Sequence, residues 1–371
     1  RMGKKTINGR QLIKRGWQQS PAIGLAIILG RSWLQQGQSR QQVLNQLDAV
    51  HADPAEFVNR EETQQLAELL IKQRQPRQMV PLREEPAPLA VWGKELIDPA
   101  SFAQIEAAAK LPTAVRVALM PDAHVGYGLP IGGVAALEGA IAPYMVGVDI
   151  GCRMHATIFD RSPIHLQQAS SLYEELLWEE TFFGREAPPK KARNKHPILD
   201  DPRWNELPRH LRSLRLKAAE QLGTSGGGNH FVEWTKLTVT ADNSLNIPEG
   251  KYIALVSHSG SRGVGCKLAN YYSKMAQDLC SFLPKEMRNL GYLTTQSGDA
   301  DEYELAMTLA GDFARANHEV IHERIAQALG GETLGVLQNH HNFAWRVEQE
   351  EKRPPVYIHR KGATPAAQGV L

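Results

Sequence analysis

The spacing of hydrophobic positions changes along the chain near residue 76. In residues 9–75, leucine, isoleucine and valine recur every three or four positions, with glutamine, arginine and aspartate between them. That spacing places apolar side chains on one face of a helix, so it predicts a small helical N-terminal module over residues 1–75. Ser39 and Asp53 are candidate N-caps of the runs that follow them, and Pro54 suits a first helical position.

A proline-rich segment follows this module. Four prolines stand among charged residues in residues 76–92: Pro76, Pro81, Pro86 and Pro88. Because proline cannot continue a helix, the pattern predicts a linker.

Beyond the linker, short β-branched runs alternate irregularly with longer helical ones. Glycine-bounded runs predict strands near residues 115–120, 132–136, 154–158, 231–234 and 252–257. Helical spacing predicts helices near residues 164–180, 211–222, 266–282 and 301–329. The order is not a regular strand–helix alternation, so we expect an α+β domain over residues 93–371, with a mixed β-sheet core and flanking helices.

Composition and charge narrow the class of protein. The chain has 371 residues, is 42% hydrophobic and carries a formal net charge of +2, so it can bury one large core or two ordinary ones. Three cysteines are too few for a disulfide framework, which favours a reducing, cytoplasmic location. The apolar stretch at residues 21–30 is too short to span a bilayer, so no membrane association is expected.

The most informative chemical feature is the pair Asp149 and Cys152, three residues apart among glycines. Three other segments place His230, His258 and His341 beside glycine or asparagine near predicted strand ends. One carboxylate, one thiolate and three imidazoles can form a mononuclear site or a two-metal site with a bridging sulfur, and these ligand types alone favour zinc. The alternative for each histidine is a turn residue bonded to backbone.

A glycine triplet precedes one of these histidines. Gly226, Gly227 and Gly228 can bring backbone amides close to a phosphate, with Asn229 adding a side-chain donor. A tight turn without a ligand explains the triplet equally well. Its junction with His230 favours a phosphate beside a metal.

Six segments, in this order, closely resemble motifs of the RtcB family of RNA ligases. They are PDAHVGYGLPIGGV at 121–134, VGVDIGC at 146–152, LGTSGGGNHFVE at 222–233, SHSGSRG at 257–263, HN at 341–342 and HRKGAT at 359–364. Motifs of this length in this order are specific. The resemblance covers residues 93 to 371 and leaves out the helical module.

The resemblance implies a reaction and its cofactors. Members of that family join RNA ending in a 3′-phosphate or 2′,3′-cyclic phosphate to RNA with a 5′-hydroxyl, using GTP and Mn²⁺, in RNA repair or tRNA splicing. Carried over to this chain, Cys152 bridges two Mn²⁺ ions, Asp149 and His230 complete one site, and His258 and His341 complete the other. The preference for manganese comes from the family, since the ligand types favour zinc.

The resemblance also implies a GTP site. Its residues lie in two motifs: Asn229, His230, Phe231, Val232, Glu233, His341 and Asn342. Asn229 is expected to contact phosphate and Glu233 the guanine edge, whereas Phe231 is more typical of a core residue than of a stacking platform.

The residue that receives the nucleotide is not identified. In the family, GMP is transferred to a histidine well downstream of the HRKGAT segment, and none of the 13 histidines here matches it. We therefore expect that histidine beyond Leu371; the alternative is a divergent member of the family that no longer ligates RNA. Asp122 and His124 in the first motif are candidates for a proton relay or an RNA contact, with a structural turn as the alternative.

Basic residues suggest RNA contacts, each with a plain structural alternative. Arg262 could clamp a phosphate or form a structural salt bridge. The cation-rich residues 185–217, with Trp204 among them, could follow an RNA backbone or form a solvated face. His359, Arg360 and Lys361 could meet a terminal phosphate or form a basic strand end.

Two other functions fit the same residues. A metal-dependent phosphoesterase acting on RNA ends without GTP would need the ligands but no nucleophilic histidine. A non-catalytic RNA-end-binding protein would use the helical module to recruit a partner. An activating protein partner is left open.

Overall fold

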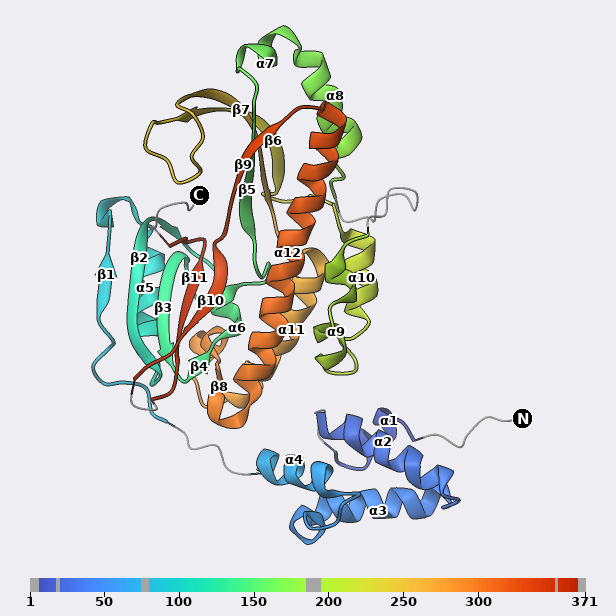
Figure 1. Ribbon diagram of the computed structural model, residues 1–371. Coiled ribbons are helices and arrows are strands. Elements are labelled where there is room, and N and C mark those ends of the chain that lie inside the picture. Colours follow the sequence, from blue (N-terminus) through green and yellow to red (C-terminus); the bar gives the residue numbers. More distant parts are fainter. Residues whose placement is uncertain (1–6, 18–20, 75–79, 185–194, 351–352, 366–371) are drawn as a thin grey trace. The chain divides into compact units, whose positions relative to one another are not determined.

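The computed structural model describes residues 7–17, 21–74, 80–184, 195–350 and 353–365 (Figure 1). The chain forms two compact units, Arg1–Gln78 and Met79–Leu371. Among the described residues, no helix is both long and apolar enough to cross a membrane.

The first unit is helical, as predicted. Its elements are α1 (Gly9–Lys14), α2 (Pro21–Gln35), α3 (Arg40–Ala52), a 3-10 turn (Pro54–Phe57) and α4 (Gln64–Arg74). Ser39 caps α3, since its side chain accepts a hydrogen bond from the Gln42 N–H. Asp53 stands at the N-cap position of the 3-10 turn, with Pro54 at its first position as predicted, but the Asp53 side chain makes no capping hydrogen bond. Leu12, Trp33 and Leu47 lie in the core of this unit.

The second unit contains three sheets. The first has the strand order β1 (Leu89–Val91), β2 (Ala114–His124), β3 (Ile131–Glu138), β11 (Val356–Lys361) and β10 (Asn342–Val347). The second pairs β4 (Ala140–Ile141) with β8 (Leu293–Thr294). The third is antiparallel, in the order β6 (Phe231–Val239), β7 (Gly250–Ser259), β5 (Arg153–Phe159) and β9 (Thr333–His340). The predicted α+β class is confirmed.

Helices flank the sheets. Figure 1 shows the long helix α12 (Asp299–Leu329) running beside β5 and β9. The other helices of this unit are α5 (Pro99–Ala109), α6 (Pro143–Val146), α7 (Ile164–Gln168), α8 (Ser170–Glu180), α9 (Arg203–Glu206), α10 (Leu214–Gln221) and α11 (Arg262–Leu279). A core cluster that includes Trp204, Tyr272, Leu309 and Phe313 joins α9, α11 and α12.

The structure differs from the predicted elements in several places, and helix α5 was not predicted. The helix expected over residues 164–180 is divided into α7 and α8, because Ala169 leaves helical geometry with ψ of 38°. Strands β9, β10 and β11 were not predicted. Strand β1 lies inside residues 76–92, the segment interpreted as a linker, and pairs in parallel with β2.

Candidate metal centre

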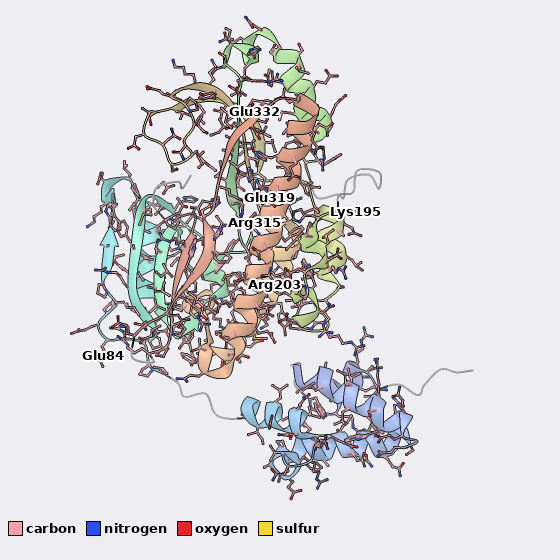
Figure 2. The ribbon with its side chains drawn as sticks, viewed as in Figure 1. Glu84, Lys195, Arg203, Arg315, Glu319 and Glu332 are labelled. Carbon is pink, nitrogen blue, oxygen red and sulfur yellow. The ribbon has the colours of Figure 1, made fainter. Side chains whose placement is uncertain are left out.

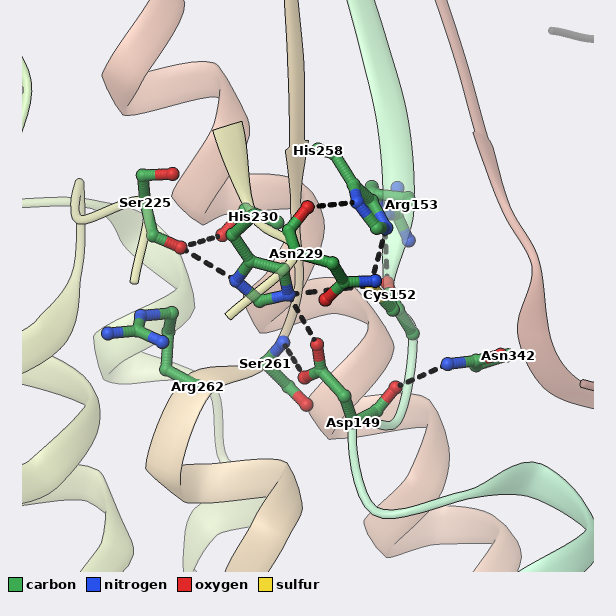
Figure 3. A network of polar contacts seen from close by, with 12 residues as sticks. Asp149, Cys152, Arg153, Ser225, Asn229, His230, His258, Ser261, Arg262 and Asn342 are labelled. Atoms are coloured by element: carbon green, nitrogen blue, oxygen red, sulfur yellow. Dashed lines mark hydrogen bonds and ion pairs between the residues drawn. The ribbon is translucent and has the colours of Figure 1, made fainter. Parts of the chain in front are cut away.

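Four segments far apart in the sequence meet at one end of the third sheet (Figure 3). In the antiparallel register, the start of β5 lies beside the ends of β7 and β9: Arg153 pairs with both Ser259 and His340. Cys152 directly precedes β5, His341 directly follows β9, and His258 lies on β7 opposite Phe231 of β6. The strand order therefore gathers side chains that the sequence separates by up to 189 residues.

A glycine-flanked loop presents Asp149. Gly147 and Gly151 have φ of 103° and 71°, a region that favours glycine, and a Cβ on Gly151 would lie 2.7 Å from the Gly311 Cα. The Ser261 N–H donates to Asp149 Oδ1 at 3.1 Å. These constraints direct the carboxylate toward His230 (Figure 3).

The donor atoms form two overlapping groups. In the first, His230 Nε2 lies 2.9 Å from Asp149 Oδ2 and 3.6 Å from Cys152 Sγ. In the second, His258 Nε2 lies 3.1 Å from Cys152 Sγ and 3.1 Å from His341 Nε2. Within each group all donor atoms lie within 4.8 Å of one another, and Cys152 belongs to both.

Backbone carbonyls fix the tautomers of two of these histidines. His230 Nδ1–H donates to the Ser225 carbonyl at 2.8 Å, and His258 Nδ1–H donates to the Asn229 carbonyl at 3.0 Å. Because a carbonyl oxygen can only accept, the Nε2 atom of each neutral ring carries a lone pair directed into the centre. Carbonyl-oriented imidazoles of this kind are typical of metal ligands.

Burial also sets the protonation of the donor set. It lowers the pKa of His341 to about 4 and lowers the pKa of His258. Burial, helped by the Asp149 carboxylate, raises the pKa of the Cys152 thiol. At neutral pH the His258 and His341 imidazoles are therefore neutral, as metal ligation requires, and a bound cation would favour the Cys152 thiolate. One group offers an oxygen, a sulfur and a nitrogen donor, and the other offers a sulfur and two nitrogen donors. Two such groups that share one thiol fit a pair of divalent ions.

Three of the residues predicted to hold GTP, Phe231, Val232 and Glu233, lie on β6 and divide between its two faces. Phe231 and Glu233 share the face that carries the His258 ring, with ring centroids of Phe231 and His258 5.7 Å apart. Glu233 and Asn229 are exposed, whereas Val232 is buried on the opposite face beside Phe159. Phe231 belongs to no core cluster of the described residues, so it is not the core side chain that the sequence favoured.

Asn342 connects two loops. Its Oδ1 accepts the Gly362 N–H at 2.8 Å, and its Nδ2 donates to the Asp149 backbone carbonyl at 3.4 Å. The side chain of this predicted GTP residue therefore supports the loop that carries Asp149.

Asp122 and His124 lie exposed on β2, and neither belongs to a donor group. His124 Nδ1 lies 3.0 Å from the Asp122 carbonyl. Arg262, with φ of 55°, donates to Thr224 Oγ1 at 3.2 Å and to the Gly184 carbonyl at 2.7 Å. Neither acceptor is a carboxylate, so the Arg262 guanidinium forms no salt bridge among the described residues.

Of the two interpretations of the basic segment, the structure excludes the one in which Trp204 stacks on RNA. Trp204 is 1% exposed and donates to the Ile198 carbonyl at 2.7 Å. Arg203 forms ion pairs with Asp201 and with Asp312 of α12, against which it lies (Figure 2). Stacking of RNA on Trp204 is therefore excluded in this fold. Residues 185–194, which hold several of the predicted contacts, lie outside the described residues.

Two of the three basic strand-end candidates are also wrong. His359 is fully buried, donating from Nδ1 to the Ala135 carbonyl and accepting the Ala142 N–H at Nε2. Lys361 is buried and donates to the carbonyls of Tyr127 and Tyr144. The alternating pattern of β11 turns both side chains inward, so Arg360 alone of the three is half exposed.

The sequence did not reveal the residues that orient the ligands. Ser225 and Ser261 lie within the recognised motifs, but they act through backbone groups. Asn317 of α12 had a weak signal, since it continues the buried stripe of Ala310, Phe313 and Ile321 at helical spacing. A polar residue on such a stripe needs partners.

Known proteins resemble this chain over the same region. A family model described as tRNA-splicing ligase RtcB matches residues 104–201 and 190–370. RNA-splicing ligase RtcB of Escherichia coli (strain K12) is 29% identical over 317 residues, covering 78% of this chain and 74% of that protein. RNA-splicing ligase RtcB1 of Escherichia coli strain ATCC 25922 is 31% identical over 319 residues, with the same shares.

A relative from another organism matches the chain to a similar degree. The tRNA-splicing ligase RtcB of Aeropyrum pernix is 30% identical over 302 residues, covering 67% of this chain and 62% of that protein. The family match contains all five donor residues and begins after the helical unit. The chain belongs to the RtcB family.

Proposed function

We propose that this protein is an RNA ligase that joins RNA 3′-phosphate or 2′,3′-cyclic phosphate ends to 5′-hydroxyl ends, using GTP and two Mn²⁺ ions. One observation carries the proposal: Asp149, Cys152 and three histidines direct their donor atoms to two adjacent points. The names of the relatives, RNA-splicing and tRNA-splicing ligase, supply the reaction class.

In this proposal Cys152, which belongs to both donor groups, would be a ligand of both ions. Asp149 and His230 would help to hold one ion, and His258 and His341 the other. Two adjacent divalent cations supply charge neutralisation for phosphate groups and polarise the phosphorus under attack. Manganese is proposed from the family, because sulfur and imidazole donors also suit zinc.

The nucleotide would lie along the exposed face of β6. The Gly227 and Gly228 amides and the Asn229 side chain are exposed immediately before His230, where they can bind phosphate oxygens. The Glu233 carboxylate, farther along the same face, can accept hydrogen bonds from N1–H and the 2-amino group of guanine. Phe231 lies between them and offers an apolar contact. Arg262, without a salt bridge among the described residues, is proposed to bind the RNA phosphate.

The deciding experiment is covalent capture of the nucleotide. Protein made from the full open reading frame is incubated with labelled GTP and Mn²⁺, and then with RNA carrying a 3′-phosphate and RNA carrying a 5′-hydroxyl. An acid-labile, base-stable GMP adduct and a joined RNA are expected. Cys152→Ala should abolish both, whereas Cys266→Ala, which changes an exposed cysteine, should not.

Other outcomes would select the other functions. Opening of a 2′,3′-cyclic phosphate without GTP, by a metal-loaded protein that forms no adduct, would identify a phosphoesterase. RNA-end binding that survives both metal removal and Cys152→Ala would identify a non-catalytic RNA-binding protein. Either result would contradict the ligase proposal.

A further inference from the structure

A buried amide lies behind the metal centre. Asn317 of α12 is 0% exposed, and its Oδ1 accepts the N–H groups of Gly223 at 2.8 Å and Thr224 at 3.1 Å. Its Nδ2 donates to the Thr224 carbonyl at 2.9 Å and to Ser259 Oγ at 3.3 Å. An amide side chain offers two donors and two acceptor lone pairs, so all four are used. A flipped amide would face its NH₂ group toward two N–H donors, which fixes a single orientation.

The Asn317 bonds continue to a metal ligand. Because Ser259 Oγ accepts from Asn317, its own proton is free to donate to the Ser225 carbonyl, 2.7 Å away. The same carbonyl accepts Nδ1–H of His230 at 2.8 Å. Asn317 therefore restrains the Ser225 carbonyl indirectly by two routes. One route is the backbone of Gly223 and Thr224, and the other is the Ser259 hydroxyl.

The Ser225 carbonyl decides where the proton of neutral His230 lies. With the carbonyl in place, the proton stays on Nδ1 and Nε2 faces Asp149 and Cys152 with a lone pair. If the carbonyl moves, the proton can transfer to Nε2 and donate to Asp149 instead, which blocks the atom that would bind a metal. The position of the Ser225 carbonyl therefore decides whether the neutral His230 ring can bind a metal through Nε2.

We infer that Asn317 is a positioning residue of the metal centre, which keeps His230 in its ligating tautomer through Ser259 and Ser225. This inference rests on the metal centre of the proposed function. It also predicts an asymmetry, because His258 donates instead to the Asn229 carbonyl, which accepts no bond from Asn317. Loss of Asn317 should weaken the ion held by Asp149 and His230 more than the ion held by His258 and His341.

The first test needs no metal. Long-range ¹H–¹⁵N spectra of ¹⁵N-histidine-labelled, metal-free protein report which ring nitrogen carries the proton, and His230→Gln identifies the signal. In the wild type every His230 ring is expected to carry a proton on Nδ1, whether or not Nε2 shares a second proton with Asp149. Asn317→Ala and Ser259→Ala are expected to show a fraction of rings protonated on Nε2 alone. Full protonation of Nδ1 in both variants would overturn the inference.

The second test measures the metals. In Mn²⁺ titrations followed by electron paramagnetic resonance, Asn317→Ala is expected to weaken one of two ions by about 10–100-fold, as is typical when an outer-shell partner is lost. Leu309→Ala is the control, since Leu309 is fully buried on the same helix and its hydrocarbon side chain forms no hydrogen bond. It should lower stability and leave both affinities unchanged.

The outcomes separate the inference from the proposed function. If the wild type binds no ion at these histidines, the proposed metal centre fails, whereas the metal-free tautomer spectra still decide the role of Asn317. If the wild type binds two ions and both variants bind them equally well, the inference fails and the centre stands. Ser259→Ala, which removes one oxygen atom, serves where Asn317→Ala does not fold.

Discussion

Asp149 Oδ2 lies 2.9 Å from His230 Nε2, on the side of the ring that carries the lone pair when Nδ1 donates to Ser225. Two lone pairs at this distance repel each other unless a cation is shared between them. A proton can supply that charge, and so can a metal ion, which would also engage Cys152 at 3.6 Å from the same nitrogen. Metal and proton therefore compete for one position.

Removal of the shared thiol should release both ions. Cys152 belongs to both donor groups, so Cys152→Ala is expected to bind fewer than one Mn²⁺ per chain where the wild type binds two. Asp149→Asn, which weakens one group, should retain one ion. Metal content after dialysis, measured by plasma mass spectrometry, checks both values. Two ions retained in Cys152→Ala would exclude a bridging thiolate, and Cys266→Ala is the matched cysteine control.

Glu233 should decide the preference for guanine. It is exposed on the face of β6 that carries Phe231, and Glu233→Gln keeps its size while removing the charge. Loss of a charged hydrogen-bond acceptor costs about 1.5–3 kcal/mol, so GTP binding should weaken by roughly 10–150-fold while ATP binding changes little. Calorimetric titration with each nucleotide measures this.

A neighbouring residue provides the comparison for Glu233. Lys236 is exposed on the opposite face of the same strand, and Lys236→Gln should bind GTP as the wild type does. Equal loss of GTP and ATP affinity in Glu233→Gln would assign the residue to phosphate or fold rather than to the base.

Hydrophobic spacing along the sequence correctly predicted several strands and helices of the second unit. The β-branched runs of β5 and β7 and the long apolar stripe of α12 were found from spacing. Strand β9 was missed because Gly335, Gln338 and Asn339 break its alternation, and its pairing with β5 joins residues more than 170 positions apart. The donor residues were found because glycines and motif order mark them.

Burial that depends on distant packing could not be predicted. Trp204 lies among cations in the sequence, which suggested an exposed aromatic, but Arg203 pairs with Asp312, 109 residues away, and closes α9 against α12. Asn317 likewise finds its partners 93 and 94 residues away along the chain. No local pattern specifies which loop a buried amide will hold.

Trp204 should therefore contribute to stability and not to RNA binding. Trp204→Phe removes the indole N–H that bonds Ile198 and leaves a smaller ring in the core, which should lower the free energy of unfolding by about 1–3 kcal/mol. RNA affinity at native conditions should not change. Urea unfolding and fluorescence anisotropy with labelled RNA give the two values.

The control for Trp204 is another tryptophan. Trp178 on α8 is 78% exposed, so Trp178→Phe should change stability by less than about 0.5 kcal/mol. A fall in RNA affinity in Trp204→Phe, with stability unchanged, would restore the stacking hypothesis.

His359 should make the fold sensitive to acid. Burial lowers the pKa of its ring to about 4, and both ring nitrogens are already bonded, Nδ1 to the Ala135 carbonyl and Nε2 to the Ala142 N–H. In the unfolded chain the ring titrates near 6.5, so between pH 6.5 and 4 the unfolded state binds a proton that the folded state does not. Stability is therefore lost as the pH falls through this window, by about 2 kcal/mol at pH 5 from this ring.

A variant without a titrating group isolates this contribution. His359→Gln retains an amide donor and acceptor but cannot be protonated, so its unfolding free energy should fall less steeply than that of the wild type between pH 6.5 and 5. Above pH 7 the two curves should run parallel, because the ring is neutral in both states. Urea unfolding of the metal-free protein at pH 8, 7, 6 and 5 measures the difference. Curves that remain parallel down to pH 5 would show that the ring accepts a proton in the folded protein, which requires the Ala142 N–H to leave Nε2.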